Sequence, residues 1–597
     1  MDRTAIIVII VCFALMGLWT FVLLPKFNPP KPLPPGTTNA LAPTLAATNQ
    51  ATAPPPPTAE APAPQRGPIA TKNVPEELLT VTNGDGRYTF TSHGGGLKLI
   101  ELVRYPETVS ARRSKEPHTN RVATLNTFTL APTLALLGSD AVQGDGVFNL
   151  TKTANGVRAE KALTNGLSIV KEFELSTNYL LNATVLFENH SSQQLALPPQ
   201  DWVVGTATPM GPLDKGEAVG VLWYNGAKTE DASGATYFAS GGCRQRVAPL
   251  EYRAGASNVL WVAAHNQFFA LAAMLPTNQP GQALIVRRID LPRLTGEDAR
   301  LVAPNAPPPQ GYEAALVHPG LTLAPNQTVT NQVFFYAGPK EYQTLARISD
   351  RFNNNLDLVM NFGWAGFVSK ALLLGMNWLH HALRVSYGWA IITITIIIKL
   401  VFWPLTQAST RSMKRLQALQ PQMNAIKEKY KDDPVKMNRK TMEFMKEHKV
   451  SPLGGCLPMV LQIPVFFGFY SMIRSAIELR GAPFLWVGDL SQPDTLFIIP
   501  GTAFPFNLLP LIMGVTMLWQ SHLTPPSPGM DPMQAKMMRY MPLMFMVFLY
   551  NFSAGLTLYW TVQNLLTIAQ TKLTKTIQAP GPPAKGPGLT PPPKKRK

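Results

Sequence analysis

The sequence predicts a polytopic α-helical membrane protein with six transmembrane helices, five of which form a carboxy-terminal core, and an extracytoplasmic all-β domain before that core. Three observations predict this class: apolar runs long enough to enter a bilayer, a middle region of short alternating strands, and basic residues gathered in two stretches. The chain of 597 residues is 46% hydrophobic and 15% charged, so it is too long for one core and should form several domains.

The first expected element is an amino-terminal membrane anchor over residues 1–24. Its apolar run is about 20 residues long, which suffices to cross a hydrocarbon core of ~30 Å. Pro25 and Lys26 follow in place of a small-x-small cleavage site, so the anchor should remain uncleaved. Residues 25–68 are rich in proline, alanine and threonine. Such a composition cannot bury enough apolar surface to fold, and it predicts an extended linker.

Residues 69–345 predict an antiparallel β-sandwich. Apolar and polar residues alternate through residues 167–175 and again through residues 179–187, which is the pattern of a β-hairpin. Similar strands are expected near residues 87–92, 283–288 and 328–336. His93 and the three glycines after it are similar to the oxyanion loop of lipases, but the chain has no G-x-S-x-G motif. A turn or bulge is therefore expected there.

No cofactor, metal site or enzymatic reaction is predicted. The three cysteines, Cys12, Cys243 and Cys456, lie too far apart for a metal-ligand motif and suggest no disulfide framework. A carbohydrate enzyme built on the β-domain would need an acid–base pair that the sequence does not identify, so it ranks lowest among the alternatives. Neither a Walker A loop nor a kinase-like glycine loop is present, so no nucleotide fuel is indicated.

The last third of the chain predicts an interfacial amphipathic helix, residues 360–383, and then a core, residues 387–575. The core holds five apolar runs, at residues 387–405, 453–473, 506–520, 538–552 and 554–570. Basic residues crowd the loop at 411–449 and the tail at 576–597, which assigns both to the cytoplasm. Four crossings between them give six spans in total, with both termini cytoplasmic and the β-domain in a bacterial periplasm.

The first cytoplasmic loop predicts a helical hairpin over residues 409–450. Apolar residues recur every three or four positions from Met413 to Tyr430, which predicts one helix, and Asp433 with Pro434 predicts the amino-terminal cap of a second. Methionines in the second helix either pack the hairpin or offer a pliable surface to varied apolar partners. The residues expected to contact a client or ribosome are Met413, Lys414, Met437, Met445, Lys594, Lys595 and Arg596.

One cation interrupts the second predicted span. Lys399 lies among isoleucine, leucine, valine and phenylalanine within residues 391–402. A lysine at the centre of a span costs roughly 2.5 to 3.5 kcal/mol, which its apolar neighbours can offset. One hypothesis is that the side chain snorkels to the inner headgroups. The other is that it faces a water-filled groove, together with Thr395, Gln462, Gln563 and Asn564.

Five long stretches carry a resemblance to a known family. They read YGWAIITITIIIKLVFWPLT, RSMKRLQALQP, SPLGGCLPMVLQIPVFFGFY, DPMQAKMMRYMPLMFMVF and SAGLTLYWTVQNLLTIAQ. Together they resemble the conserved core of the YidC/Oxa/Alb membrane protein insertases over about residues 360–575. The anchor and β-domain before the core resemble the Gram-negative type, whose periplasmic domain is a β-supersandwich similar to galactose mutarotase.

The resemblance implies a groove open to the cytoplasm and to lipid but closed to the periplasm. Its implied residues are Thr395, Lys399, Gln462, Thr516 and Tyr559. The family usually has an arginine where this chain has Lys399, so the positive charge is retained while the bidentate fork of arginine is lost.

The resemblance also implies a function and partners. The protein would insert nascent membrane proteins into the cell inner membrane and help them fold, alone or with the Sec translocon. Its net charge of +17 suits contact with a ribosome and with membrane lipid, and no DNA partner is expected. The alternative is a solute or lipid transporter that uses the same polar groove. Transporters usually show internal repeats, and the two halves of this chain show none.

Overall fold

The computed structural model describes residues 74–110, 121–138, 140–212, 214, 216–233, 237–238, 249–299, 308–448, 457–499, 504–523 and 532–573. The chain divides into two compact units. The first holds the described residues up to Tyr105, from Val122 to Pro339 and from Thr344 to Val359, and the second holds the others. The predicted anchor at 1–24, the linker at 25–68, the tail at 576–597 and all three cysteines lie outside the described residues.

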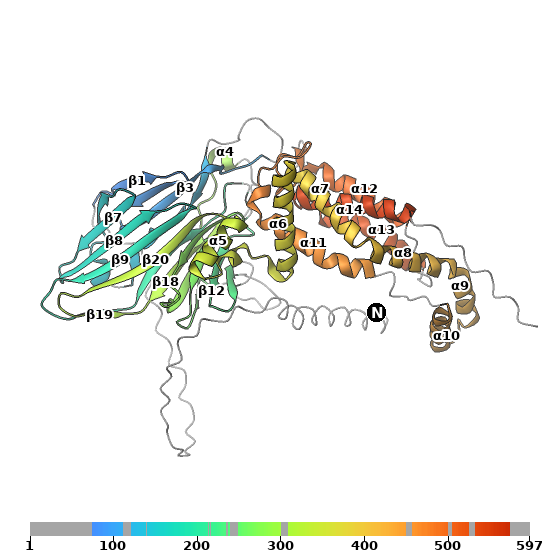
Figure 1. Ribbon diagram of the computed structural model, residues 1–597, viewed down its shortest axis with the longest axis horizontal. Coiled ribbons are helices and arrows are strands. Elements are labelled where there is room, and N and C mark those ends of the chain that lie inside the picture. The colour runs from blue at the N-terminus through green and yellow to red at the C-terminus, as the bar shows by residue number, and fades with distance from the viewer. Residues whose placement is uncertain are drawn as a thin grey trace, which may run out of the picture. The chain divides into compact units, whose positions relative to one another are not determined.

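The first unit is built of antiparallel sheets (Figure 1). The largest sheet has the strand order β13-β12-β15-β16-β20-β9-β8-β7-β6. Its strands are β6 (Asn149–Lys152), β7 (Gly156–Ala162), β8 (Leu167–Leu175), β9 (Leu180–Asn189), β12 (Gly220–Tyr224), β13 (Thr229–Ser233), β15 (Trp261–His265), β16 (Phe269–Met274) and β20 (Thr328–Pro339). The predicted hairpin is confirmed as β8 and β9, which pair from Leu167 opposite Asn189 to Leu175 opposite Leu181.

A second sheet packs against the first. Its strand order is β14-β17-β18-β11-β5, and β11 and β18 contact β15 of the large sheet. Its strands are β5 (Leu136–Leu137), β11 (Gln200–Ala207), β14 (Glu251–Ala254), β17 (Ala283–Asp290) and β18 (Gln310–His318). The smaller sheets are formed by β1 (Leu78–Thr82), β2 (Arg87–Thr91), β3 (Gly96–Pro106) and β4 (Val122–Leu125), and by β10 (Leu195–Leu197) with β19 (Leu321–Leu323). Two short helices, α3 (Asp140–Gln143) and α4 (Gly296–Ala299), lie between strands, and α5 (Tyr342–Phe352) and η2 (Leu356–Met360) follow β20.

The side-chain period of two explains why these segments are strands. Along β9, Leu181, Ala183, Val185 and Phe187 are buried, while the residues between them are partly exposed. Strands β15 and β16 are buried at every position, as expected where a strand is covered on both faces. The core of the first unit therefore lies between the two packed sheets.

The turn predicted after β2 is confirmed, and a buried lysine holds it. Gly95 has a φ of +56°, and a Cβ there would lie 2.3 Å from the Phe148 ring, so only glycine fits. The Lys171 Nζ donates to the Gly94 carbonyl at 2.7 Å and to the Leu134 carbonyl at 2.9 Å, and it lies 4.3 Å from the centre of the Phe148 ring. The glycines thus serve close packing around a fully buried amine.

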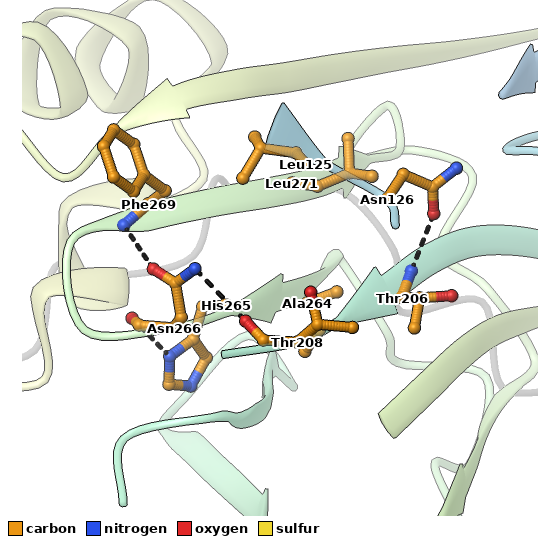
Figure 2. A pocket seen from close by; sticks show the side chains of 10 residues that line it. Leu125, Asn126, Thr206, Thr208, Ala264, His265, Asn266, Phe269 and Leu271 are labelled. Carbon is orange, nitrogen blue, oxygen red and sulfur yellow. Dashed lines mark hydrogen bonds between the residues drawn. The ribbon is translucent and has the colours of Figure 1, made fainter. Parts of the chain in front are cut away.

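A small cavity in the first unit is too small to hold a sugar (Figure 2). Its volume is about 10 Å³, which is room for one water at most. The Asn126 Oδ1 accepts from the Thr206 backbone N–H at 2.9 Å, and the Asn266 side chain bonds the backbone of Phe269 and Thr208. These asparagines connect loops to strands around this cavity.

The second unit is helical (Figure 1). Its helices are α6 (Gly366–Leu383), α7 (Tyr387–Val401), α8 (Trp403–Ala418), α9 (Gln420–Lys429), α10 (Pro434–Glu447), α11 (Leu457–Ser475), α12 (Leu508–Leu523), α13 (Pro532–Phe548) and α14 (Ala554–Leu573). The short turns η3 (Gly363–Ala365) and η5 (Ile477–Leu479) and the strand pair β21 (Thr495–Ile498) and β22 (Pro505–Asn507) complete it. Helix α14 packs against α7, α11 and α12, α6 packs against α7 and α11, and α13 packs against α12.

Each of the five predicted apolar runs forms a helix, namely α7, α11, α12, α13 and α14. None of the helices in the described part of the chain, taken singly, is both long and apolar enough to cross a bilayer. The segments Gly363–Leu383 and Tyr387–Val401 meet that requirement only together, and they are bent by 118° at the break between them.

The single helix predicted from Met413 to Tyr430 is wrong. Helix α8 ends at Ala418 and α9 begins at Gln420, with Leu419 between them. Pro421, near the start of α9, explains the break, because proline has no N–H and its ring excludes the carbonyl of the preceding turn. The predicted cap of α10 is confirmed, since the Asp433 carboxylate accepts from the Lys436 backbone N–H at 3.0 Å.

We predict that Lys171→Met destabilises the first unit by about 1 to 3 kcal/mol, because two buried carbonyls lose their donor. Burial, followed by the charge of Lys161, lowers the pKa of Lys171 well below its usual 10.5. Between the lowered pKa of Lys171 in the folded chain and its usual pKa in the unfolded chain, only the unfolded chain binds the proton. Wild-type stability should therefore rise with pH in that range. Lys171→Met should abolish that slope.

Urea unfolding of the full chain, followed through hydrogen exchange of the β8 and β9 amides, measures both effects. The control is Lys228→Met, since the Lys228 side chain is exposed and pairs with Glu230. An unchanged pH slope in Lys171→Met would contradict the assignment.

Candidate functional site

The candidate site begins on α7 with Lys399 and Thr395, which lie one helical turn apart on the same face. Lys399 is only 7% exposed, and its Nζ donates to the Thr567 Oγ1 of α14 at 2.9 Å. Thr395 is fully buried, and its hydroxyl donates to the Ile391 carbonyl of its own helix at 2.7 Å. The ammonium of Lys399 therefore faces a neighbouring helix, and the described bond of Thr395 stays within α7.

From Thr567 a series of hydrogen bonds continues across two helices. The Thr567 hydroxyl donates to the Gln563 carbonyl at 2.7 Å, one turn earlier on α14. The Gln563 side-chain N–H donates to the Gln462 Oε1 of α11 at 3.0 Å, and the Gln462 side-chain N–H donates to the Tyr559 hydroxyl of α14. The Tyr559 ring is buried and stacks on Phe469, with 4.1 Å between ring centres. We call Lys399, Thr567, Gln563, Gln462 and Tyr559 the polar ladder.

Asn564 and Thr516 form a separate pair. The Asn564 side-chain N–H donates to the Thr516 Oγ1 of α12 at 3.2 Å, and the Thr516 hydroxyl donates to the Met513 carbonyl at 2.7 Å. Adjacent residues on a helix point in directions about 100° apart, so Gln563 reaches α11 while Asn564 reaches α12. The structure thus brings together four of the seven predicted site residues, Lys399, Gln462, Tyr559 and Gln563, and separates Asn564 and Thr516 from them.

Three members of this region were not predicted from the sequence. Thr567 is the partner of Lys399, and the Gln570 side chain donates to the Thr406 Oγ1 of α8 at 2.7 Å. A signal was present, since Tyr559, Gln563 and Thr567 recur at intervals of four residues and so share one face of α14. Thr406 had no such signal, because it lies beyond the end of α7 in a helix that was not expected to begin there.

The ammonium of Lys399 has no acidic partner among the described residues, and its bond to Thr567 is to a neutral hydroxyl. An ammonium has three N–H donors and no acceptor, so the site offers a positive charge and donors to an incoming anionic or carbonyl group. The bundle therefore presents a cation in a region that is otherwise lined with neutral hydroxyl and amide groups.

The outer face of the bundle is apolar. Large hydrophobic side chains that are exposed on α7, α12 and α13 include Ile396, Ile397, Leu400, Val401, Val515, Trp519, Met541, Met544, Val547 and Phe548. Exposed apolar side chains in this number on one bundle mark a membrane or protein contact.

The predicted client-contact residues lie in different surroundings. Met445 is buried with Leu419 and Met423 in the small core of the hairpin formed by α8, α9 and α10, and Met437 is half-buried. The side chains of Met413 and Lys414 and the whole of Lys594, Lys595 and Arg596 lie outside what the structure describes. Exposed apolar side chains on α10 are Val435 and Met442.

Comparison with known proteins identifies both units. Residues 78–374 match the family model described as YidC periplasmic domain, and residues 378–580 match the one described as 60Kd inner membrane protein. A protein of Citrifermentans bemidjiense named membrane protein insertase YidC is 34% identical over 501 residues, which cover 81% of this chain and 82% of that protein.

Other matches are shorter or more distant. A protein of the same name from Cupriavidus necator is 42% identical over 316 residues, 53% of this chain and 50% of that protein. The chain thus spans about half the length of this relative and of similar ones. A solved structure of an active YidC insertase with its first transmembrane domain resolved is 19% identical, covers 86% of this chain and 96% of that chain, and has a TM-score of 0.33.

We predict that Thr567→Val destabilises the helical unit by about 1 to 3 kcal/mol, because the shape is kept while the buried ammonium of Lys399 loses its acceptor. Thr561→Val is the matched control, since Thr561 is buried on the same helix and donates to the Thr557 carbonyl of that helix. Its cost should stay below about 0.5 kcal/mol. Unfolding of the full chain in micelles titrated with dodecyl sulfate measures both, and equal costs would contradict the role of Thr567.

Proposed function

The chain belongs to the YidC family, whose members have a periplasmic β-rich domain and a helical region, and from this premise we propose that it inserts nascent integral membrane proteins into the bacterial inner membrane. It would also help them fold there, alone or with the Sec translocon. The observation that carries the proposal is the buried cation of Lys399, which has a neutral hydroxyl as its partner inside a bundle with an apolar exterior.

The physical task is to carry a short polar flank of a client across hydrocarbon. Each unsatisfied backbone group costs several kcal/mol there, so an unaided crossing is prohibitive. A groove lined by hydroxyls, amides and one cation would supply hydrogen-bond partners for part of the path and shorten the barrier. Partition of the apolar segment of the client into lipid would then supply the driving force, so no chemical step and no cofactor is required.

The polar ladder suits such a groove because its bonds are exchangeable. A hydrogen bond between two neutral groups contributes only about 0.5 to 1.5 kcal/mol net, so a client carbonyl can replace the Gln563–Gln462 bond at little cost. The residues that would line the groove are Thr395, Lys399, Gln462, Thr516, Tyr559, Gln563 and Asn564. We add Thr567, because it accepts a hydrogen bond from Lys399. The groove would open to the cytoplasm and to lipid and close toward the periplasm.

We further propose six membrane-spanning helices: the anchor at residues 1–24 and helices α7, α11, α12, α13 and α14. Helix α7 has 15 residues and so is about 22 Å long, less than a hydrocarbon core of ~30 Å. A bilayer adapts to short spans by thinning around them, which would lower the barrier that a client meets. Both termini would be cytoplasmic, and the β-rich unit and residues 474–505 would be periplasmic.

The proposed partners are nascent membrane proteins, the Sec translocon, the ribosome and membrane lipid. Basic side chains on the hairpin, including Lys436 and Arg439, could reach ribosomal RNA or anionic headgroups by salt-sensitive electrostatics. The apolar Val435 and Met442 on the same helix offer contact to an apolar client segment.

We predict that liposomes containing the purified chain insert a small two-span test protein, while empty liposomes do not. Lys399→Ala should slow insertion about tenfold or more, which corresponds to about 1.4 kcal/mol of barrier, because the groove loses its charge. Lys399→Arg should keep most of the activity if charge is what matters, and Lys228→Ala in the β-rich unit is the control. Protection of the test protein from external protease is the measurement.

Three outcomes decide between the hypotheses. Insertion by the wild type and loss in Lys399→Ala support the groove. Equal insertion by the wild type and by Lys399→Ala would show that Lys399 has no role in the groove. No insertion, combined with flux of a solute through the same liposomes, would favour the transporter instead.

We predict opposite accessibility for two single cysteines in a chain whose native cysteines are replaced by serine. Leu485→Cys, 55% exposed after η5, should react with an impermeant maleimide in intact spheroplasts. Val435→Cys, 80% exposed on α10, should react only after permeabilisation, because an odd number of spans would separate the two positions. Labelling of both positions in intact spheroplasts would contradict six spans in this arrangement.

A further inference from the structure

A buried amide–carboxyl contact joins two segments of the helical unit that are far apart in sequence. Asn377 on α6 is 4% exposed, and its side-chain N–H donates to the Glu478 Oε1 of η5 at 2.9 Å. Helix α6 precedes α7, and η5 follows α11, so the contact ties the helix expected at the membrane surface to the start of the loop after the third predicted span.

The other two oxygens of these side chains lack a hydrogen-bond donor in the described part of the chain. The Asn377 Oδ1 and the Glu478 Oε2 are both buried, and neither has a hydrogen-bond partner among the described residues. An ionised carboxylate accepts only, so two acceptors would then face a buried space without a donor, which costs about 1 to 3 kcal/mol for each. A protonated carboxyl carries one O–H, and if this O–H donates to the Asn377 Oδ1, both oxygens take part in a hydrogen bond.

We propose that Glu478 is protonated in the resting protein and that its Oε2–H donates to the Asn377 Oδ1. The pair then forms a two-bond acid–amide ring that fastens α6 to η5. Loss of the proton removes one bond and turns the two remaining oxygens into like partial charges, so the joint loosens. The contact is therefore a pH-sensitive joint, and it stands whether or not the insertion proposal holds.

The surroundings of Glu478 favour the neutral form. Burial is the main cause that raises its pKa above the usual 4.5, and the charge of Glu341 raises it further, against the opposing bonds from Asn377 and from its own backbone. From α7 the Tyr387 hydroxyl faces it, and the Tyr387 ring stacks on His380 of α6, with 4.0 Å between ring centres.

The nearby cations are directed elsewhere. Arg480 donates to the Pro106 carbonyl at 2.8 Å and to the Glu107 carbonyl at 2.9 Å, and Arg474 of α11 donates to the Tyr470 hydroxyl at 3.0 Å. From α6, Lys370 lies over the Tyr342 ring, 4.8 Å from its centre, and none of these cations forms an ion pair with Glu478 in the described chain.

Two other buried acids of the same loop show what Glu478 lacks. The Asp489 carboxylate accepts from the Ser491 backbone N–H at 2.8 Å and from its hydroxyl at 2.7 Å. The Asp494 carboxylate accepts from the Leu509 backbone N–H at 2.6 Å and from the Trp486 ring N–H at 3.1 Å. Each accepts from at least two donors on other residues, whereas Glu478 accepts from one, the Asn377 side chain, besides its own backbone N–H.

The sign of the pH effect follows from this arrangement. Above about pH 4.5 the unfolded chain releases the proton of Glu478, while the folded chain still binds it. The stabilisation that this proton gives is therefore fully present below that pH. Its contribution falls as the pH rises through the raised pKa of the folded protein. A mildly acidic solution around this loop therefore strengthens the contact between α6 and η5, and a mildly alkaline solution weakens it.

Infrared spectroscopy of the full chain in phospholipid vesicles tests the protonation directly. At neutral pH, the wild type should show the carbonyl stretch of a protonated carboxyl group that is missing in Glu478→Gln. The control is Glu443→Gln, since Glu443 is bonded by Lys440 and Arg439 on the exposed face of α10 and should leave that signal unchanged. A spectrum identical in wild type and Glu478→Gln would show that Glu478 is ionised and would overturn the proposal.

Hydrogen exchange of residues 476–482, corrected for the intrinsic pH dependence of exchange, tests the joint. The wild type should exchange about fivefold faster at about pH 8 than at about pH 5, which is the effect expected for one buried hydrogen bond. Glu478→Gln keeps an N–H donor at the same place, so exchange should stay slow at both pH values. Asn377→Leu should exchange fast at both, and a wild-type pH response in either variant would overturn the proposal.

Discussion

The hydrogen bond between the Lys399 ammonium and the Thr567 hydroxyl sets the arrangement of the helical unit. A charge among isoleucine and leucine is tolerated only where a polar partner meets it, so α14 must lie against α7 with Thr567 at that level. Gln563 and Tyr559 follow on the same face of α14 at intervals of four residues, and they place Gln462 of α11 beside them. One buried cation thus fixes the mutual register of three helices.

Two of the buried lysines, Lys171 and Lys399, are held in different ways, and the difference follows their surroundings. Lys171 in the β-rich unit bonds two backbone carbonyls and lies over the Phe148 ring, so its partners are rigid. Lys399 bonds one side-chain hydroxyl, which can rotate and which also donates to the Gln563 carbonyl. A fixed cage suits a structural role. A single movable acceptor suits a cation that is to exchange partners.

Features that depend on a local pattern of residues could be predicted from the sequence. Contacts between segments that lie far apart in the chain could not. The hairpin of β8 and β9, the cap at Asp433 and the positions of the five apolar helices follow from periodicity and capping chemistry that neighbouring residues supply. The partner of Lys399 does not, because Thr567 lies 168 residues away and only packing brings the two together. The break at Leu419 is a local feature that Pro421 indicates, whereas the apolar spacing alone indicates one continuous helix.

Asn377 and Glu478 explain why polar contacts at the ends of the bundle are harder to predict than those inside it. Within a helix, a threonine hydroxyl can turn back to its own carbonyl, as Thr395 and Thr561 do, so a polar residue needs no distant partner. At the junction of α6 and η5 the backbone is no longer regular, and a side chain must find its partner across the fold. The pairing of an amide with an acid satisfies every oxygen in only one protonation state. Such a contact therefore converts the pH of its surroundings into a change in how tightly two segments are joined.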